Sequence, residues 1–99
     1  IMDTKRQEYE LAKKRVSFSK SLKALKNNPD FINLIEKGYL DHYLKTLVTG
    51  SIYSQDARAE YLNSERIRAI SYFEYFLKEV SNYEQSDLKL IKFYENGEE

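Results

Sequence analysis

Residues that interrupt helices are scarce in this 99-residue chain, and this scarcity limits its fold more than any other feature. The sequence holds one proline, Pro29, and three glycines, Gly38, Gly50 and Gly97. Between them, apolar residues recur every three or four positions, which is the spacing that places side chains on one face of a helix. No pair of alternating apolar and polar runs is joined by a hairpin turn. We therefore predict an all-α fold, a small bundle of four to five helices in a single domain over residues 1–99.

The first predicted helix runs from Asp3 to about Lys26. Its apolar stripe is expected to consist of Leu11, Phe18, Leu22 and Leu25, with Ala12 and Val16 alongside. The sequence Asn27-Asn28-Pro29 should end this helix and start the next. Asn suits both a helix end and an N-cap, and Pro suits the first helical position because its missing N–H would have no partner there.

Gly38 and Gly50 divide the next part of the chain. A short second helix is expected to stop at Gly38, and a third helix is expected to stop at Gly50. The second helix carries Phe31, Leu34 and Ile35, and the third carries Leu40, Tyr43, Leu44, Leu47 and Val48. A lone glycine costs a helix only about 1 kcal/mol relative to Ala, so one helix running through Gly38 stays open as the alternative.

A long helix is predicted near residues 55–82, after a loop at residues 51–54. Its apolar residues follow a period close to 3.6 and include Tyr61, Leu62, Ala69, Ile70, Phe73, Phe76, Leu77 and Val80. A final short helix is expected to start at Ser86 and to carry Leu88, Ile91 and Tyr94, with Gly97 beyond its end.

Charge is distributed unevenly, although the net charge is zero. Residues 1–26 hold eight basic and three acidic residues, whereas residues 51–99 hold six basic and ten acidic residues. A cationic helix face can be solvated, can meet an acidic surface on the same or another chain, or can attract phosphates by counterion release. All three interpretations stay open. The nucleic-acid interpretation uses Lys13, Lys14, Arg15, Lys20 and Lys23.

Residues that commonly form catalytic sites are few. The chain has no Cys, which excludes thiolate zinc sites, iron–sulfur clusters and cysteine nucleophiles. His42 is the single histidine, so a site with two histidine ligands cannot form. The three glycines are too scattered for a phosphate-binding loop. We therefore expect no enzymatic activity, no metal and no cofactor.

Nine tyrosines and five phenylalanines are more aromatic residues than one helix stripe can hold. In the segment Tyr72-Phe73-Glu74-Tyr75-Phe76, successive residues lie 100° apart, so Tyr72 and Tyr75 flank a core formed by the phenylalanines. Tyrosine tolerates exposure and is enriched at the centres of interfaces. These tyrosines either pack at the boundary of the bundle or form a protein–protein interface. The interface interpretation uses Tyr39, Tyr43, Tyr72 and Tyr75.

One group of turn and core residues carries a family resemblance. The group consists of Asn28-Pro29-Asp30-Phe31, Leu34-Ile35, Gly38-Tyr39-Leu40, Leu44 and Leu47. It resembles a pattern in small all-helical accessory proteins of tailed bacteriophages, and the likeness covers about residues 19 to 80. The resemblance implies a component of the phage particle or of its packaging apparatus, and it brings no catalytic residue with it.

Taken together, these features predict a non-enzymatic helical module that self-associates, most simply as a homo-oligomer, or docks on a larger phage or host assembly. The alternatives are a nucleic-acid-binding module that uses the basic first helix and a phage inhibitor that covers a host protein surface. No run approaches the roughly 20 apolar residues of a membrane span, and the charged start lacks the apolar segment of a signal peptide. We expect the protein in the host cytoplasm or in the virion.

Overall fold

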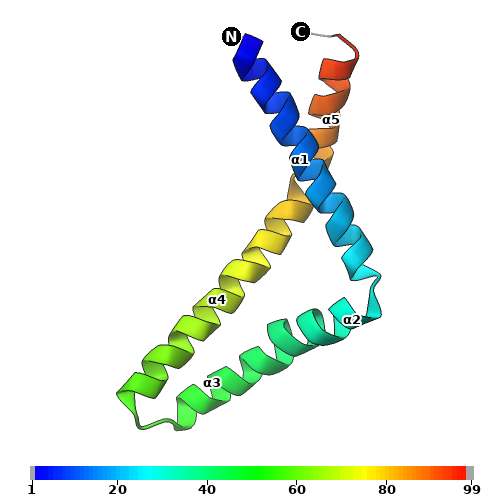
Figure 1. Ribbon diagram of the computed structural model, residues 1–99. Coiled ribbons are helices and arrows are strands. Elements are labelled where there is room, and N and C mark those ends of the chain that lie inside the picture. The colour runs from blue at the N-terminus through cyan, green and yellow to red at the C-terminus, as the bar shows by residue number, and fades with distance from the viewer. Residues whose placement is uncertain (1, 98–99) are drawn as a thin grey trace. The chain divides into compact units, whose positions relative to one another are not determined.

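The computed structural model describes residues 2–97, and the side chains of residues 4–97. Throughout this part of the chain the regular structure is helical, which confirms the all-α prediction. The elements, most of which are labelled in Figure 1, are α1 (Met2–Lys26), α2 (Pro29–Phe31), a π-helical segment η1 (Ile32–Tyr43), α3 (Leu44–Tyr53), α4 (Ala57–Asn82) and α5 (Glu84–Glu95).

The predicted count of four to five helices is wrong, because in the described part of the chain these elements join into three helices. At the junctions of η1 with α2 and α3, Phe31 (φ −63°, ψ −45°) and Tyr43 (φ −63°, ψ −41°) keep a right-handed helical backbone. At the junction of α4 and α5, the Tyr83 N–H donates to the Glu79 carbonyl (3.3 Å) and the Asp87 N–H donates to the Tyr83 carbonyl (3.0 Å). This four-residue hydrogen-bonding pattern continues across Tyr83, so α4 and α5 form one bent helix.

Gly38 does not end a helix, so the predicted stop at this residue is wrong and the continuous alternative holds. Gly38 lies inside η1, whose turns are wider than those of an α-helix. A Cβ atom at Gly38 would lie 3.2 Å from the carbonyl oxygen of Asn33, five residues earlier. Five residues is the hydrogen-bonding interval of a π-helix, so the missing side chain leaves room for this close turn.

The predicted start of the second helix is confirmed. Asn28 is its N-cap, with an extended backbone (φ −90°, ψ 120°), and Pro29 takes the first helical position. The Asn28 Oδ1 atom accepts hydrogen bonds from the N–H groups of Asp30 (2.8 Å) and Phe31 (3.2 Å). The side chain therefore satisfies two of the donors that a helix start leaves without partners.

Most of the other predicted boundaries hold to within two residues, but the predicted stop of the third helix at Gly50 is wrong. The helix α3 continues through Gly50 to Tyr53 and takes up most of the loop predicted at residues 51–54, because a glycine costs a helix only about 1 kcal/mol relative to Ala. The long helix starts at Ala57 and ends at Asn82, and α5 starts at Glu84, before the expected Ser86. Gly97 lies beyond the end of α5 with a positive φ of 73°, as is common for a glycine that follows a helix.

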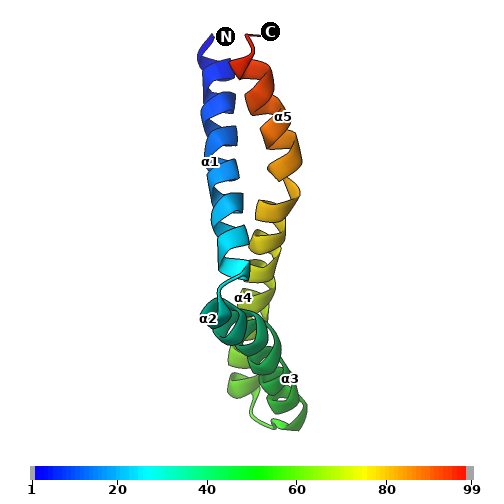
Figure 2. The ribbon, with the colours of Figure 1, turned by 90° about the vertical axis from the view of Figure 1, so that its right-hand side faces the viewer.

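The chain divides into two compact units. Unit 1 comprises Ile1–Ala24 and Leu77–Glu99, and unit 2 comprises Leu25–Phe76. In unit 1, α1 and α5 lie side by side and run in opposite directions, as the two views in Figures 1 and 2 show. Unit 2 is a helical hairpin. Its first arm is the helix Pro29–Tyr53, its second arm is the first part of α4, and residues 54–56 join them (Figure 1).

The predicted apolar stripe of α1 is wrong for three of its four main members. Leu11, Phe18 and Leu25 are 51%, 50% and 43% exposed. The buried residues of α1 are Ala12, Val16, Ser19 and Leu22, at spacings of four, three and three. Leu11 and Phe18 each precede a buried residue by one position, which places them about 100° around the helix from the core. The core face instead uses small residues that allow close approach.

Unit 2 has a thin core with one buried apolar side chain on each arm. These are Leu47 on the first arm and Ile70 on α4. The ring of Tyr39 packs edge-on against Phe73 at a centroid distance of 5.9 Å, which adds an aromatic contact between the arms. Many large apolar side chains of this unit are therefore left outside its core.

Candidate interaction surfaces

An apolar hollow lies on the first arm of unit 2. Its volume is about 330 Å³. We use the name apolar hollow for this depression together with its lining residues, which are Leu34, Ile35, Gly38, Tyr39 and Tyr43. No polar atom lines it. Gly38 contributes no side chain, and the wide turns of η1 separate the residues on either side of it. The result is an open apolar depression with Leu34 69% exposed at its edge.

Two of the four predicted interface tyrosines meet in this hollow. The rings of Tyr39 and Tyr43 are stacked, with centroids 6.1 Å apart and an interplanar angle of 22°. Tyr39 also contacts Phe73 on the other arm, so its ring is held from two sides. This support fixes the ring without covering it completely, which is a favourable arrangement for a binding surface because little side-chain entropy remains to be lost.

The other two predicted tyrosines lie on α4 and point away from its core. Tyr72 is 68% exposed and Tyr75 is 63% exposed. Neither ring makes an aromatic contact with another ring in the described part of the chain. The structure therefore brings Tyr39 and Tyr43 together and places Tyr72 and Tyr75 on a separate exposed flank of the same unit.

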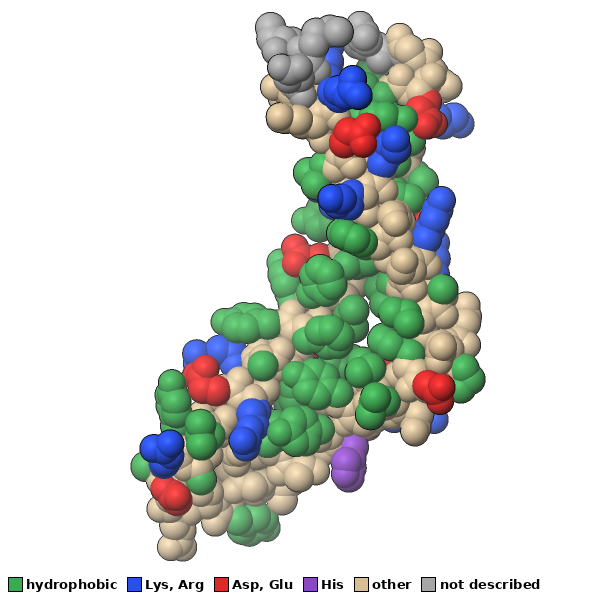
Figure 3. Space-filling model, viewed as in Figure 1, with side chains coloured by type: hydrophobic (Ala, Val, Ile, Leu, Met, Phe, Trp, Pro, Cys, Tyr) green, Lys and Arg blue, Asp and Glu red, His purple; other side chains and the backbone are tan. Residues whose placement is uncertain are grey.

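Exposed apolar side chains are common elsewhere on unit 2. Figure 3 shows hydrophobic side chains gathered over both arms of this unit. The exposed ones include Val48, Ile52, Tyr53, Tyr61, Leu62 and Phe76. Contiguous exposed apolar surface on a soluble domain commonly marks a place where another molecule binds.

Sequence reasoning found the tyrosines of the hollow and missed the rest of its lining. The sequence predicts Leu34 and Ile35 as part of a short second helix and Gly38 as its end, and it gives none of the three a role in a binding surface. A glycine with apolar residues three and four positions before it and one and five positions after it was the available signal. This pattern is recognisable as one surface only if the helix is known to continue through Gly38. A glycine at this position instead favours the prediction that the helix ends there.

The five basic residues of the nucleic-acid interpretation have different surroundings. Arg15 donates two hydrogen bonds to Asp87, from Nε to Oδ2 (3.0 Å) and from Nη2 to Oδ1 (2.8 Å). Lys23 donates to Glu84 Oε1 at 2.7 Å. Two of the five residues are thus held by the acidic α5. The remaining three, Lys13, Lys14 and Lys20, are exposed on α1.

A reciprocal pair of tyrosine–carboxylate hydrogen bonds joins the start of α1 to the end of α5. Tyr9 donates to Glu95 Oε2 (3.0 Å), and Tyr94 donates to Glu8 Oε2 (2.9 Å). The two rings also meet edge to face, at 5.8 Å. Each hydrogen bond to a carboxylate raises the pKa of the donating tyrosine above its ordinary value, because ionisation of the phenol would break the bond.

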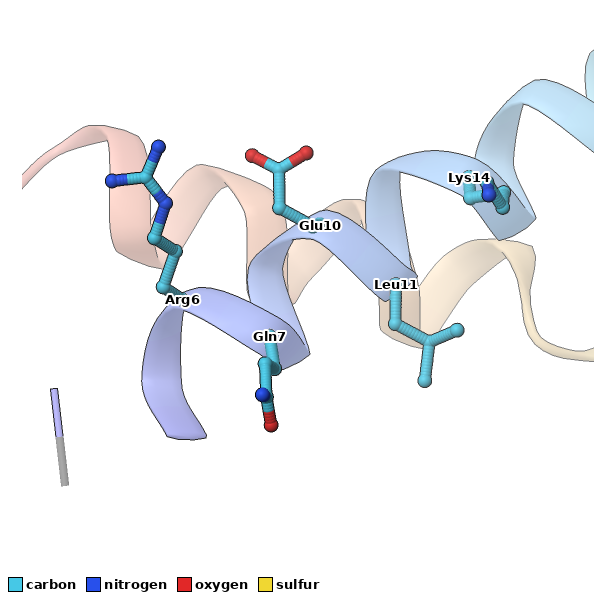
Figure 4. A pocket seen from close by; sticks show the side chains of 5 residues that line it. All are labelled: Arg6, Gln7, Glu10, Leu11 and Lys14. Carbon is cyan, nitrogen blue, oxygen red and sulfur yellow. The ribbon is translucent and has the colours of Figure 1, made fainter. Parts of the chain in front are cut away.

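A further hollow lies along α1 alone. Its volume is about 550 Å³, and its lining residues are Arg6, Gln7, Glu10, Leu11 and Lys14 (Figure 4). All five come from consecutive turns of one helix, and Figure 4 shows Arg6 and Glu10 on one side of the ribbon and Gln7 and Leu11 on the other. This arrangement contains no nucleophile with a neighbouring base, so it offers no recognisable reaction centre.

The single histidine, His42, lies near the end of η1. Asp41, the nearest carboxylate in the sequence, forms an ion pair with Lys45 at 3.0 Å. His42 itself is exposed. Among the side chains that the structure describes, no group of three or more His, Cys, Asp or Glu residues is arranged to hold a metal ion.

Within the described residues, no helix is long and apolar enough to cross a membrane.

Comparisons with protein-family models, with curated proteins and with solved structures find no match to this chain.

Proposed function

We propose that this protein is a non-enzymatic helical interaction module, an accessory component of a phage particle or packaging apparatus that self-associates or docks on a larger assembly. The observation that carries the proposal is the apolar hollow around Tyr39 and Tyr43, with its wholly apolar lining. Exposed apolar surface costs free energy in water, and a partner that covers it recovers that free energy. The host cytoplasm and the virion are the places where such a component would act.

The magnitudes favour an interface larger than the hollow alone. Covering one exposed Leu or Tyr side chain contributes about 1.5–3 kcal/mol. Two or three such side chains contribute about 3–9 kcal/mol, whereas association costs about 4–15 kcal/mol in lost freedom of movement, so this number of side chains leaves little or no net affinity. Tyr72 and Tyr75 on α4 supply further exposed area in the same unit. The proposed interaction surface therefore comprises the hollow and, as a second contact of the same unit, the exposed flank that carries these two tyrosines.

The phage part of the proposal rests on the resemblance given above. The Asn28-Pro29-Asp30-Phe31 turn that carries much of this resemblance begins the arm that holds the hollow. Gly38 and Tyr39, which also belong to the resembling pattern, are part of the lining of the hollow. Four of the five lining residues of the hollow therefore belong to the resembling pattern: Leu34, Ile35, Gly38 and Tyr39.

The test compares two matched substitutions in affinity purification from phage-infected cells. Leu34→Asp introduces a charge at the edge of the hollow, and Ile52→Asp introduces the same charge outside it in the same unit. The two side chains are almost equally exposed, at 69% and 70%. We expect the wild type and the Ile52→Asp variant to retain one phage component and Leu34→Asp to lose it, with circular dichroism showing equal helicity. Equal retention by both variants, or absence of any phage component with the wild type, would contradict the proposal.

A further inference from the structure

A second groove lies within unit 1, between α1 and α5. Its volume is about 470 Å³, and its lining residues are Lys13, Val16, Ser17, Lys20, Ser21, Leu88 and Ile91. Val16, Leu88 and Ile91 give it an aliphatic floor. Lys13 and Lys20 stand on its α1 side, and no acidic residue lines it. The groove thus combines an apolar surface with a cationic edge.

The positive charges of this groove are placed at a helical interval. Lys13 and Lys20 are seven residues apart on α1, which corresponds to about 10.5 Å along the axis and nearly the same side of the helix. Lys92 follows Leu88 by four residues on α5 and therefore lies on the same side as that floor residue. Lys13 is 3.9 Å from Glu10 and 4.8 Å from the centre of the Tyr9 ring, whereas no carboxylate of the described chain pairs with Lys20.

We propose that this groove binds an acidic amphipathic helix of a partner protein, laid along α1 and α5. Apolar residues at intervals of three and four would cover Leu88, which is 39% exposed, and the half-buried Ile91, over the already buried Val16. This is the usual arrangement of a helix in a groove. Carboxylates seven residues apart on the partner would face Lys13 and Lys20. This inference goes beyond the proposed function, because it uses unit 1 and none of the residues of the apolar hollow.

The chemistry of the floor favours a protein helix over nucleic acid. Proteins that bind single strands stack bases on aromatic rings, and the floor of this groove is aliphatic. A duplex would contact the lysines through its phosphates and would leave Val16, Leu88 and Ile91 uncovered. An acidic helix, in contrast, uses both the floor and the charged edge.

The charge pattern also favours a partner protein over a second copy. Within this chain, the one pair of acidic residues seven positions apart is Asp3 and Glu10. Glu10 already lies beside Lys13 of its own helix. The chain therefore lacks a separate acidic helix with the spacing that Lys13 and Lys20 require.

The test titrates the isotopically labelled full chain with a helix-stabilised peptide of about 15 residues, long enough to form a stable helix. This peptide carries Leu every three or four positions and Glu seven positions apart, and a second peptide carries Lys in place of each Glu. We expect the Glu peptide to bind at least about tenfold more tightly, with amide shifts centred on Val16, Leu88 and Ile91. The double variant Lys13→Glu/Lys20→Glu should reverse this preference.

The matched control is Lys14→Glu/Lys89→Glu, which makes the same change of charge in unit 1 outside the groove lining. This control should keep the preference for the Glu peptide. Equal binding of both peptides, equal loss in both double variants, or shifts away from the groove would overturn the inference. Stronger binding of duplex DNA than of the Glu peptide at the same amides would also overturn it. The Leu34→Asp variant should still bind the peptide, so failure here is distinguishable from failure of the proposed function.

Discussion

Arg15 and Asp87 form a two-pronged ion pair that ties α1 to α5 across 72 positions of sequence. The two partners differ in their access to water. Asp87 is 3% exposed, whereas the Arg15 side chain is 41% exposed. The hydrogen bonds to Asp87 raise the pKa of Arg15 further above its ordinary value, so the guanidinium stays charged. Loss of Arg15 would leave a buried carboxylate without a partner, whereas loss of Asp87 would leave a cation that water can solvate.

Replacement of Arg15 should therefore destabilise the protein strongly. We expect Arg15→Ala to lower the free energy of unfolding by about 3 kcal/mol, because a buried charge loses its partner. Arg15→Lys should cost less, since a lysine keeps the charge but loses the two-pronged geometry. The control Lys14→Ala should change stability by less than about 0.5 kcal/mol, as is usual for an exposed residue. Urea unfolding followed by circular dichroism measures these values, and equal effects of Arg15→Ala and Lys14→Ala would contradict the prediction.

The two tyrosine–carboxylate bonds predict a crossed response to mutation. Glu95→Ala should lower the pKa of Tyr9 toward its ordinary value and leave the pKa of Tyr94 raised, because Tyr94 bonds to Glu8. Glu8→Ala should have the opposite pattern. Each variant is thus the control for the other. Titration of the tyrosine ring carbons by NMR measures both values, and equal shifts of both tyrosines in either variant would argue against separate bonds.

The same bonds predict how stability depends on pH. Their tyrosine pKa values are raised in the folded state, so their contribution is fully present below the unfolded-state tyrosine pKa of about 10. This contribution is lost as the pH rises through the higher folded-state values. The double variant Tyr9→Phe/Tyr94→Phe should therefore lose less stability than the wild type between neutral and strongly alkaline pH. Thermal unfolding across this range measures the difference, and parallel curves would show that the bonds do not form.

The N-cap at Asn28 predicts a defined loss when its side chain is removed. Asn28→Ala should cost about 1 kcal/mol, because the N–H groups of Asp30 and Phe31 lose their acceptor. Asn28→Asp should retain most of the stability, since a carboxylate oxygen accepts the same hydrogen bonds. Urea unfolding of the three proteins tests this ranking. An Asn28→Ala variant as stable as the wild type would indicate that the cap contributes nothing.

The two glycines of the first arm should respond differently to alanine. At Gly50 an added Cβ would lie 3.5 Å from Asn63 Nδ2, which is an ordinary contact, so Gly50→Ala should stabilise the helix by up to about 1 kcal/mol. At Gly38 the added Cβ would lie 3.2 Å from a backbone oxygen that cannot move freely. Gly38→Ala should therefore fail to show this gain. Thermal unfolding compares the two variants, and an equal stabilisation in both would argue against the crowding at Gly38.

Helix boundaries were predictable where a single residue type fixes the backbone. Asn28 and Pro29 marked the start of the second helix because their side chains act on their own helix start, without help from tertiary contacts. Gly38 misled the prediction because the cost of a glycine in a helix is small enough for packing to override. The sequence around Tyr83 does not show whether the helix ends or continues there, because the helix bends at Tyr83 while its backbone hydrogen bonds are kept.

The core of unit 1 was predictable in part. Leu22, Val16 and Ala12 of the predicted stripe are buried, whereas the large side chains of Leu11, Phe18 and Leu25 are exposed. Hydropathy favours Leu11 and Phe18, whereas the helices approach each other over Ala12 and Ser19. A serine is not an obvious core residue, but its hydroxyl donates to the Val16 carbonyl at 2.9 Å and so is satisfied when buried. The tyrosines of the candidate surfaces could be proposed from the sequence, because tyrosine is enriched at interfaces. The groove between α1 and α5 could not be predicted, because its lining comes from two helices and the sequence does not show which helices pack against each other.

The most direct test of the central claim is the molar mass of the protein measured by light scattering over a wide range of concentration. We predict a mass that rises above the 11.8 kDa of a single chain. The triple variant Leu34→Asp/Tyr72→Ser/Tyr75→Ser should return the mass to that of one chain while the helical content is unchanged. A wild type that stays at the mass of one chain at every concentration, and that captures no phage component, would contradict the account.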